Sequence, residues 1–220
     1  MEDPEHLSAT RAAYDATADS YVQAIGTVIS AAVEAPLDRA LLEAFVEHVT
    51  QAPEGRVADV GCGPGRVAAL LADCGLEVMG VDVSPAMLAI ARNAHPGIPF
   101  EEGSLTTLPL PSASLIGVVC WYSIIHTPPE QLDDAFTELA RVLHPEGHLL
   151  LAFQAGAGEA VHRSEVYGTE ASLTSYRHAP NQVTQSAIRA GLQPHAQATR
   201  GPELPHESTQ QAFILARHRA

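Results

Sequence analysis

The chain has 220 residues, 46% of them hydrophobic, and this length suits a single domain with a sizeable core. Its formal net charge is −14, from 26 acidic residues against 12 lysines and arginines. We therefore expect no nucleic-acid partner and no anionic membrane partner, because both need a basic surface. A small anionic substrate held by one or two arginines stays open.

The cysteines and the first residues point to a cytoplasmic protein. The opening stretch MEDPEHLSAT is acidic and polar, which is not typical of a secretory signal. No uncharged run approaches the roughly 20 apolar residues that a membrane-spanning helix needs. Cys62, Cys74 and Cys120 lie in or beside apolar runs without a CxxC pair, so we expect reduced, structural thiols.

The 11 histidines show no metal-binding motif. The pair closest in sequence, His144 and His148, flanks a Pro-Glu-Gly turn and has no cysteine at ligand spacing. An HExxH motif is absent as well, so motif spacing predicts no metal site.

Strand-like and helix-like segments alternate along most of the chain. Apolar residues at helical spacing between positions 9 and 49 are divided by Pro36, which predicts at least two helices. Further helices are expected over 65–75, 85–94, 129–143 and 181–191, and strands over 56–61, 76–82, 98–103, 114–121, 147–153, 195–201 and 210–218. This alternation predicts an α/β fold with a doubly wound seven-stranded sheet, mostly parallel, with helices on both faces and a C-terminal antiparallel hairpin. The pattern lapses between residues 154 and 179, and a connection of that length is usually functional or mobile.

A glycine-rich turn follows the first expected strand, in the stretch VADVGCGPGR. Gly61, Gly63 and Gly65 let the backbone approach a ligand where a Cβ would collide, and the next helix directs free N–H groups toward that ligand. Asp82 ends the second strand, 21 positions after Gly61, where a carboxylate can accept hydrogen bonds from the hydroxyls of a ribose. We therefore expect a nucleoside-binding site.

Two common nucleotide motifs do not fit this turn. A P-loop needs Gly-Lys-Ser/Thr, which is absent, and a GxGxxG dinucleotide motif would have glycine where Arg66 stands. Asp59 lies two residues before the first glycine, and a buried acid there needs a cationic or donor partner. An ammonium group of the ligand would meet that need.

These motifs resemble those of the class I S-adenosylmethionine-dependent methyltransferases, whose folds are Rossmann-like, over about residues 13–151. VADVGCGPGR resembles the loop that holds the amino-acid end of the cofactor, and VDVSPAMLAIAR resembles the ribose segment. FEEGSLTTLPLP resembles the adenine segment, with Ser104 at a position where the family more often has aspartate. AAYDATADSYVQAI resembles an N-terminal lid helix, so residues 1–50 are expected to form a helical lid. The resemblance implies S-adenosylmethionine as cofactor, S-adenosylhomocysteine as product, and cofactor contacts from Tyr14, Tyr21, Asp59, Gly61, Cys62, Gly63, Gly65, Asp82, Val83, Met87, Gly103, Ser104, Leu105, Cys120 and Trp121.

His126 is the candidate general base, because it follows the fourth strand on the side expected to hold the cofactor. Two alternatives stay open: His126 caps the helix that begins near Pro129, or the acceptor is a carboxylate and needs no base. Residues 154–179 are expected to cover the acceptor site. The residues expected to contact the acceptor are Tyr122, His126, Tyr167, Tyr176 and Arg177.

The sequence therefore predicts an enzyme that moves a methyl group from S-adenosylmethionine to an oxygen or nitrogen of a small molecule. One alternative is a nicotinamide-dependent oxidoreductase that uses the same glycine turn and acid. Another is a protein that binds S-adenosylmethionine without catalysis. We expect a monomer or homodimer with a small-molecule partner.

Overall fold

Five parallel strands form the first part of a seven-stranded sheet. They are β1 (Arg56–Val60), β2 (Glu77–Asp82), β3 (Phe100–Glu102), β4 (Leu115–Trp121) and β5 (Leu143–Gln154). Apart from residues at their ends, β1, β2 and β4 are buried along their length, as expected for strands covered on both faces. The computed structural model describes residues 4–51 and 54–219, so positions 1–3 and 220 of the predicted domain lie outside the described residues, as do 52–53.

Two antiparallel strands complete the sheet. β8 (Leu192–Arg200) and β9 (Gln211–His218) pair with each other, and β9 also pairs antiparallel with β5. The strand order is β3-β2-β1-β4-β5-β9-β8, so the direction of winding reverses between β1 and β4. The predicted hairpin is confirmed, and its second strand lies inside the sheet.

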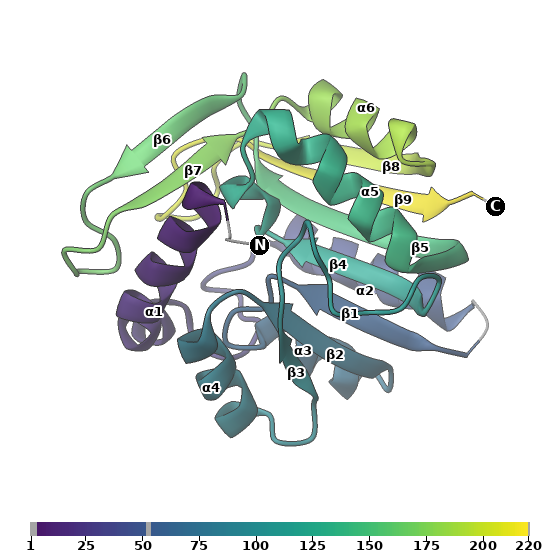
Figure 1. Cartoon of the computed structure of the whole chain (residues 1–220), viewed down its shortest axis with the longest axis horizontal. Helices are drawn as coiled ribbons and strands as arrows, with labels where there is room; N and C mark the ends of the chain where they lie inside the picture. The colour runs from purple at the N-terminus through teal and green to yellow at the C-terminus, as the bar shows by residue number, and fades with distance from the viewer. Residues whose placement is uncertain (1–3, 52–53, 220) are drawn as a thin grey trace.

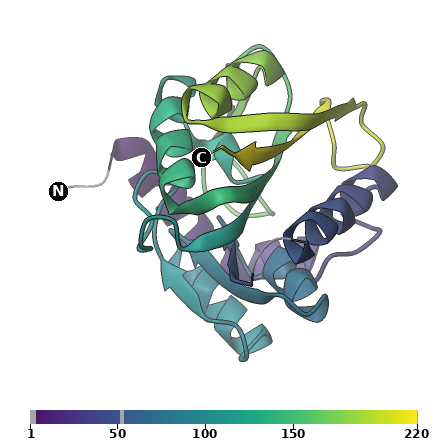
Figure 2. The same cartoon turned by 90° about the vertical axis from the view of Figure 1, so that its right-hand side faces the viewer.

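Helices cover both faces of this sheet (Figures 1 and 2). α2 (Pro36–Thr50), α3 (Arg66–Asp73) and α4 (Pro85–Ala94) pack into one buried apolar cluster with one set of strand side chains. α5 (Leu132–Val142) and α6 (Pro180–Arg189) pack into a second cluster with the opposite set. Two cores separated by one sheet are the doubly wound α/β arrangement predicted from the sequence.

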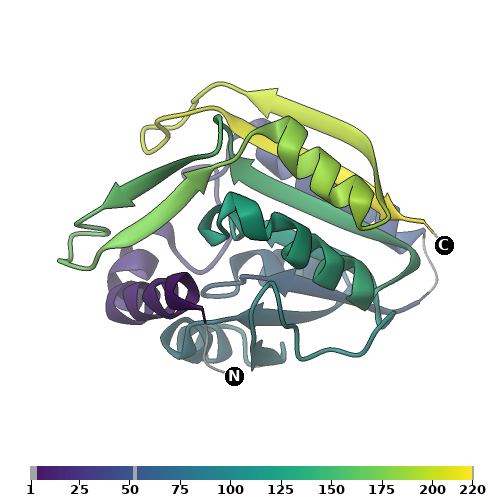
Figure 3. The same ribbon diagram turned by 45° about the horizontal axis from the view of Figure 1, so that its top comes forward.

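Two further elements extend beyond the sheet. α1 (Glu5–Ile25) contacts α4 and strand β7, and a two-stranded antiparallel hairpin is formed by β6 (Glu159–Arg163) and β7 (Leu173–Arg177) (Figure 3). The segment 154–179, in which the sequence showed no regular pattern, therefore contains regular strands. Their side chains do not alternate clearly between apolar and polar, because much of the hairpin is exposed on both faces. Two 3₁₀ turns, η1 (Ile124–His126) and η2 (Pro129–Gln131), link β4 to α5. Within the described ranges, no helix is both long enough and apolar enough to cross a membrane.

Candidate functional site

The glycine turn after β1 has a backbone that other residues adopt only with strain. Gly61 has a φ of 75°, and a Cβ built on it would lie 2.2 Å from the Cβ of Ser123. Gly63 has a φ of 52° but faces open space, and its N–H donates a 2.7 Å hydrogen bond to Oδ2 of Asp82. The turn therefore joins the tips of β1 and β2 and leaves its outer side open to a ligand.

Asp59 is a buried acid with one unsatisfied oxygen. Its Oδ2 accepts a 2.9 Å hydrogen bond from the N–H of Ala68, whereas its Oδ1 is buried without a hydrogen-bond partner in the described chain. Burial raises the pKa of Asp59 to about 7. Asp59 borders a small recess lined by Tyr21, Gly61 and Gly63, so an ammonium group placed there would find a carboxylate that forms no ion pair among the described residues.

Asp82 lies at the tip of β2 with its carboxylate fixed by backbone donors. Oδ1 accepts from the N–H of Ser84 at 2.9 Å, and Oδ2 accepts from Gly63. Each carboxylate oxygen can accept a second bond, so the group retains capacity for two ribose hydroxyls. Ser84 caps α4 by accepting from the N–H of Met87, and Asp15 of α1 accepts a 2.6 Å bond from the Ser84 hydroxyl. α1 is thereby attached directly beside the acid.

A cavity of about 260 Å³ lies at the strand tips, where the winding of the sheet reverses. Open α/β sheets bind ligands at this position. The structure places most of the predicted site residues on its wall: Tyr14, Tyr21, Gly61, Gly63, Asp82, Val83, Met87, Gly103, Ser104, Leu105, Trp121, Tyr122, His126 and Tyr167. Asp59 and Cys62 line the adjoining recess.

Four predicted site residues do not reach the cavity wall, and our assignment of contacts is corrected accordingly. Cys120 points into the core between the sheet and its helices, where it is fully buried. Gly65 begins α3 and faces the ring of Phe100, so its role is to end the turn. Tyr176 stacks on His178, and Arg177 bonds to Ser208 outside the lining. Both belong to β7, and neither is among the residues that line the cavity.

His126 and Tyr14 form a hydrogen-bonded pair at the cavity. Nδ1 of His126 lies 3.1 Å from the carbonyl oxygen of Thr174, an acceptor that requires an N–H on Nδ1. Nε2 then carries the lone pair that can accept a hydrogen bond, and the Tyr14 hydroxyl donates to it at 2.7 Å. Burial lowers the pKa of His126 to about 4, so the ring is neutral at pH 7. The imidazole is thus held in the tautomer that a general base on the cavity side requires.

Strained backbone occurs at two aromatic residues of the wall. Tyr122, directly after β4, has a φ of 58°, and Tyr167, in the turn of the hairpin, has a φ of 51°. Such conformations cost about 1–3 kcal/mol each and concentrate at functional sites. The ring of Tyr167 contacts that of Tyr21 edge to face, with centroids 4.9 Å apart. The hairpin therefore contributes one aromatic wall of the cavity.

Several cavity residues were missed in the sequence. Glu34 precedes α2 and forms a 2.5 Å buried ion pair with Arg66, and both line the cavity. His206 and Glu207 reach it from the loop between β8 and β9, and Gln211 from the start of β9. No local pattern marks these positions, because they meet the strand tips only through the tertiary fold.

The strand order is that of the class I methyltransferase fold. Residues 57–147 match the family model described as a methyltransferase domain. The predicted resemblance to methyltransferases is therefore confirmed over these residues, which contain the glycine turn and Asp82.

Two curated relatives share part of the sequence. A malonyl-[acyl-carrier protein] O-methyltransferase from Enterobacter lignolyticus (strain SCF1) is 30% identical over 156 residues, which are 71% of this chain and 60% of that protein. A demethylmenaquinone methyltransferase from Beutenbergia cavernae is 30% identical over 116 residues, 53% of this chain and 48% of that protein. The chain thus spans less than two thirds of the length of either relative.

Solved structures share the whole fold at low sequence identity. Magnesium protoporphyrin IX methyltransferase from Synechocystis PCC 6803, solved with bound S-adenosylmethionine, superposes with a TM-score of 0.71 at 18% identity, covering all of both chains. The [4+2]-cyclase SpnF superposes with a TM-score of 0.76 at 16% identity, covering 100% of this chain and 98% of that one. One fold thus supports different reactions, and the reaction must be argued from the site.

Proposed function

We propose that this protein transfers the methyl group of S-adenosylmethionine to a hydroxyl oxygen of a small, uncharged, largely apolar molecule, with nitrogen as the second choice of acceptor atom. The observation that carries the proposal is the His126–Tyr14 pair, which presents a neutral imidazole nitrogen to the same cavity that Asp82 borders. The printed name of one curated relative, an O-methyltransferase, supports oxygen.

The residues at the strand tips fit the amino-acid end, the ribose and the adenine of S-adenosylmethionine. The unpartnered oxygen of Asp59 suits the ammonium group, and Asp82 suits the ribose hydroxyls. Met87, Ser104 and Leu105 lie along the same wall and suit the adenine. When bound, the cofactor supplies an electrophilic methyl group on a sulfonium. Because its leaving group is already good, alignment is the main task of the protein, and positioning can supply roughly 7–11 kcal/mol.

The part of the cavity wall beyond these cofactor residues indicates which kind of acceptor would fit. It combines aromatic and apolar side chains from α1, the tip of β4, η1 and the hairpin with polar ones from other segments. The aromatic and apolar residues are Tyr14, Tyr21, Trp121, Tyr122, Ile125 and Tyr167, and Gln154, His206 and Gln211 are among the polar ones. Arg66, the arginine among the lining residues, already pairs with Glu34. With no unpaired arginine among the described lining residues, the wall favours an uncharged acceptor over the anionic one that the sequence left open.

His126 takes the proton that the acceptor loses. In this structure Tyr14 occupies Nε2, so the acceptor hydroxyl replaces Tyr14 as the donor to that nitrogen. S-adenosylmethionine held by Asp59 and Asp82 would supply the methyl group, its sulfur keeping the electrons of the broken carbon–sulfur bond, and Nε2 of His126 would take the hydroxyl proton. The Thr174 carbonyl keeps the ring oriented and stabilises the imidazolium.

Radiolabelled methyl transfer into a library of phenols, alcohols, amines and carboxylic acids tests the proposal. His126→Gln should lower turnover about 10²–10⁴-fold on a hydroxyl acceptor while the affinity for S-adenosylhomocysteine stays unchanged. His144→Gln, at an exposed histidine outside the cavity, is the matched control. An undiminished rate in the His126 variant would remove that residue as the base. Tight binding of S-adenosylmethionine without transfer to any compound would favour the non-catalytic alternative, and tight binding of NAD instead would favour the oxidoreductase.

Other features of the proposal rest on charge and composition. The net charge of −14 favours a small-molecule partner over nucleic acid or an anionic membrane. We retain a cytoplasmic location and a monomeric or homodimeric state as parts of this proposal.

A further inference from the structure

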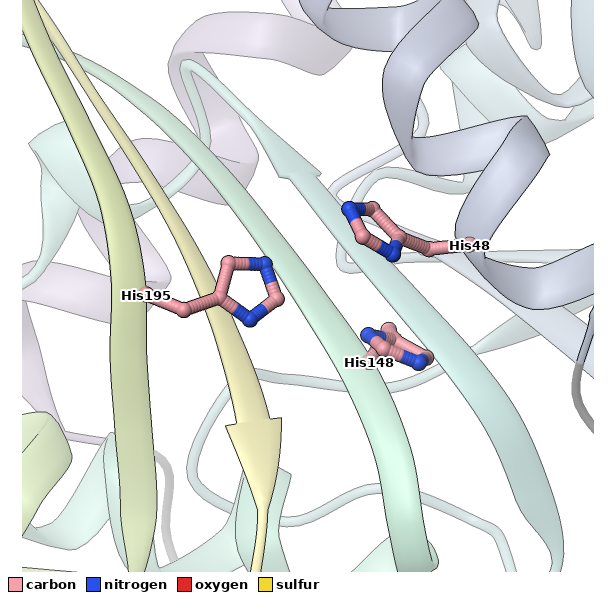
Figure 4. Close-up of side chains that lie close together, drawn as sticks. All are labelled: His48, His148 and His195. Carbon is pink, nitrogen blue, oxygen red and sulfur yellow. The ribbon is translucent and has the colours of Figure 1, made fainter.

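Three histidines from separate elements meet on the face of the sheet that α2 covers. His48 lies in the last turn of α2, His148 on β5 and His195 on β8, and Figure 4 shows their rings directed toward one another across β9. One ring nitrogen of each lies within 4.8 Å of those of the other two. The ring centroids are 5.1 Å apart for His48–His148, 5.0 Å for His48–His195 and 6.0 Å for His148–His195.

The backbone places each ring at this point. α2 packs against β5, so the end of the helix lies over the strand that carries His148. The pairing of β8 with β9 shifts register between Pro194 and Ala196, which makes His195 the extra residue of a β-bulge. Bulges commonly redirect a side chain, and here the redirected ring points toward the other two.

The buried ring of the cluster lacks a hydrogen-bond partner. His148 is 7% exposed, and its Nδ1 is buried without a partner in the part of the chain that the structure describes. A buried polar nitrogen of this kind costs free energy unless something binds it. His48 is half-buried and His195 exposed, so an ion can reach the cluster from solvent.

We infer that these three imidazoles bind one divalent transition-metal ion of the zinc type. Imidazole is the nitrogen ligand that Zn²⁺ prefers, and three histidines with a water in the fourth position form a known coordination set. Zn–N bonds of about 2.0–2.1 Å in a tetrahedron require ligand nitrogens about 3.3–3.4 Å apart. The rings must therefore close by at most about 1.5 Å, which rotation of the His48 and His195 side chains can supply.

The surrounding charges allow such an ion. An imidazole with an ordinary pKa of about 6.5 is mostly neutral at pH 7, so its ring nitrogens are available to a cation. Arg217, which faces both rings, is the nearby cation, and its guanidinium forms an ion pair with Glu146. The Glu146 carboxylate therefore offsets the positive charge of Arg217.

The ion would connect α2 to the sheet at its second end. The first turn of α2 is already attached to the sheet, because Asp38 forms a buried ion pair with Arg200 at the end of β8. His148 pairs with Gly117 near the start of β4, away from the strand tips that form the cavity. The inferred role is therefore structural and independent of methyl transfer.

Calorimetric titration of the tag-free, chelator-treated protein with Zn²⁺ tests this inference. We expect one ion per chain, a rise in Tm with Zn²⁺ and none with Mg²⁺, and a tetrahedral visible spectrum with Co²⁺. His48→Gln and His195→Gln should each weaken Zn²⁺ binding by at least about 100-fold, beyond what loss of a supporting contact causes. His144→Gln, which removes an exposed histidine outside the cluster, is the matched control and should bind as the parent does.

Circular dichroism of the metal-free variants checks that they are folded, and both cluster substitutions are at residues that are not fully buried. Absence of binding by the parent chain, or full Zn²⁺ affinity in either cluster variant, would overturn the inference. Methyl transfer plays no part in these measurements, so their outcome is independent of the proposed function.

Discussion

Replacing Asp59 with Asn should change stability and cofactor affinity in opposite directions. Asparagine keeps the shape of the side chain and an oxygen that can accept from the N–H of Ala68, but it removes the charge that an ammonium group would pair with. In the ligand-free protein that charge is buried beside an oxygen without a partner, and burial raises its pKa to about 7. The substitution therefore relieves a cost in the free protein and removes a contact in the complex.

The size of the stability change follows from the pKa. A carboxyl raised from 3.8 to about 7 keeps a proton in the folded state that the unfolded state has lost. Its contribution to stability is complete below about pH 4 and is lost as the pH rises through about 7, for a total on the order of 4 kcal/mol. At about pH 8 the amide avoids this cost, so the ligand-free Asp59→Asn protein should be about 1–4 kcal/mol more stable than the parent, and the gain should vanish near pH 4.

The affinity for S-adenosylmethionine should fall in the same variant. If the ionised carboxylate is the form that binds the ammonium group, only about 3% of the protein is competent at about pH 5.5, so S-adenosylmethionine should bind roughly 15–25-fold more weakly there than at pH 7–7.5. Asp59→Asn should lose about 1.5–3 kcal/mol of affinity near pH 7.5 and most of this pH dependence.

Urea unfolding at pH 4 and pH 8, and calorimetry between pH 5.5 and 7.5, measure the two effects. Asp73→Asn removes an exposed acid at the end of α3 and should change neither. A ligand-free Asp59→Asn protein that is less stable at pH 8, or an unchanged pH dependence of binding, would refute the reasoning.

Three further substitutions test other parts of the site. Asp82→Ala should weaken S-adenosylhomocysteine binding by about 1.5–3 kcal/mol in calorimetry, as expected for hydroxyl contacts to a carboxylate, and unchanged affinity would exclude the ribose role. Gly61→Ala should destabilise the fold by about 2–5 kcal/mol in urea, because its Cβ would lie 2.2 Å from a neighbouring Cβ at positive φ, whereas Gly97→Ala, with open space around it, should be tolerated. Arg200→Met leaves two buried acids without a cation and should lower the free energy of unfolding, measured in urea, by about 3–5 kcal/mol. Arg189→Met, at an exposed ion pair, should leave the unfolding midpoint unchanged. Equal effects of the two substitutions would contradict this account.

The half of the cavity at the tips of β1 and β2 could be predicted because its signals are local in sequence. The glycine turn, Asp59 and Asp82 follow consecutive strands, and parallel strands bring their tips to one edge of the sheet. The periodicity of α1 likewise placed Tyr14 and Tyr21 on one face, and both line the cavity.

The other half of the cavity, beyond the tip of β4, depends on contacts between distant segments. The partner of His126 is 112 residues away, and the partner of Arg200 in α2 is 162 residues away, so neither pairing leaves a trace in local spacing. The three clustered histidines are separated in the same way, and a search for short ligand motifs passes over them. Tyr176 and Arg177 were chosen by residue type within 154–179, and only the course of the hairpin shows that Tyr167 reaches the cavity and they do not.

The charges of the cavity give a reason for binding a cationic cofactor. Two acids of the lining, Glu34 and Glu207, are neutralised by Arg66 and Arg200. Asp82 instead accepts from backbone N–H groups, and Asp59 in the adjoining recess has an oxygen with no partner among the described residues. Asp59 and Asp82 therefore add uncompensated negative charge to a buried site, and burial raises the pKa of both carboxyl groups. S-adenosylmethionine carries a sulfonium charge that S-adenosylhomocysteine lacks. In the proposed reaction, the field of these acids would therefore favour the substrate form over the product and would assist product release.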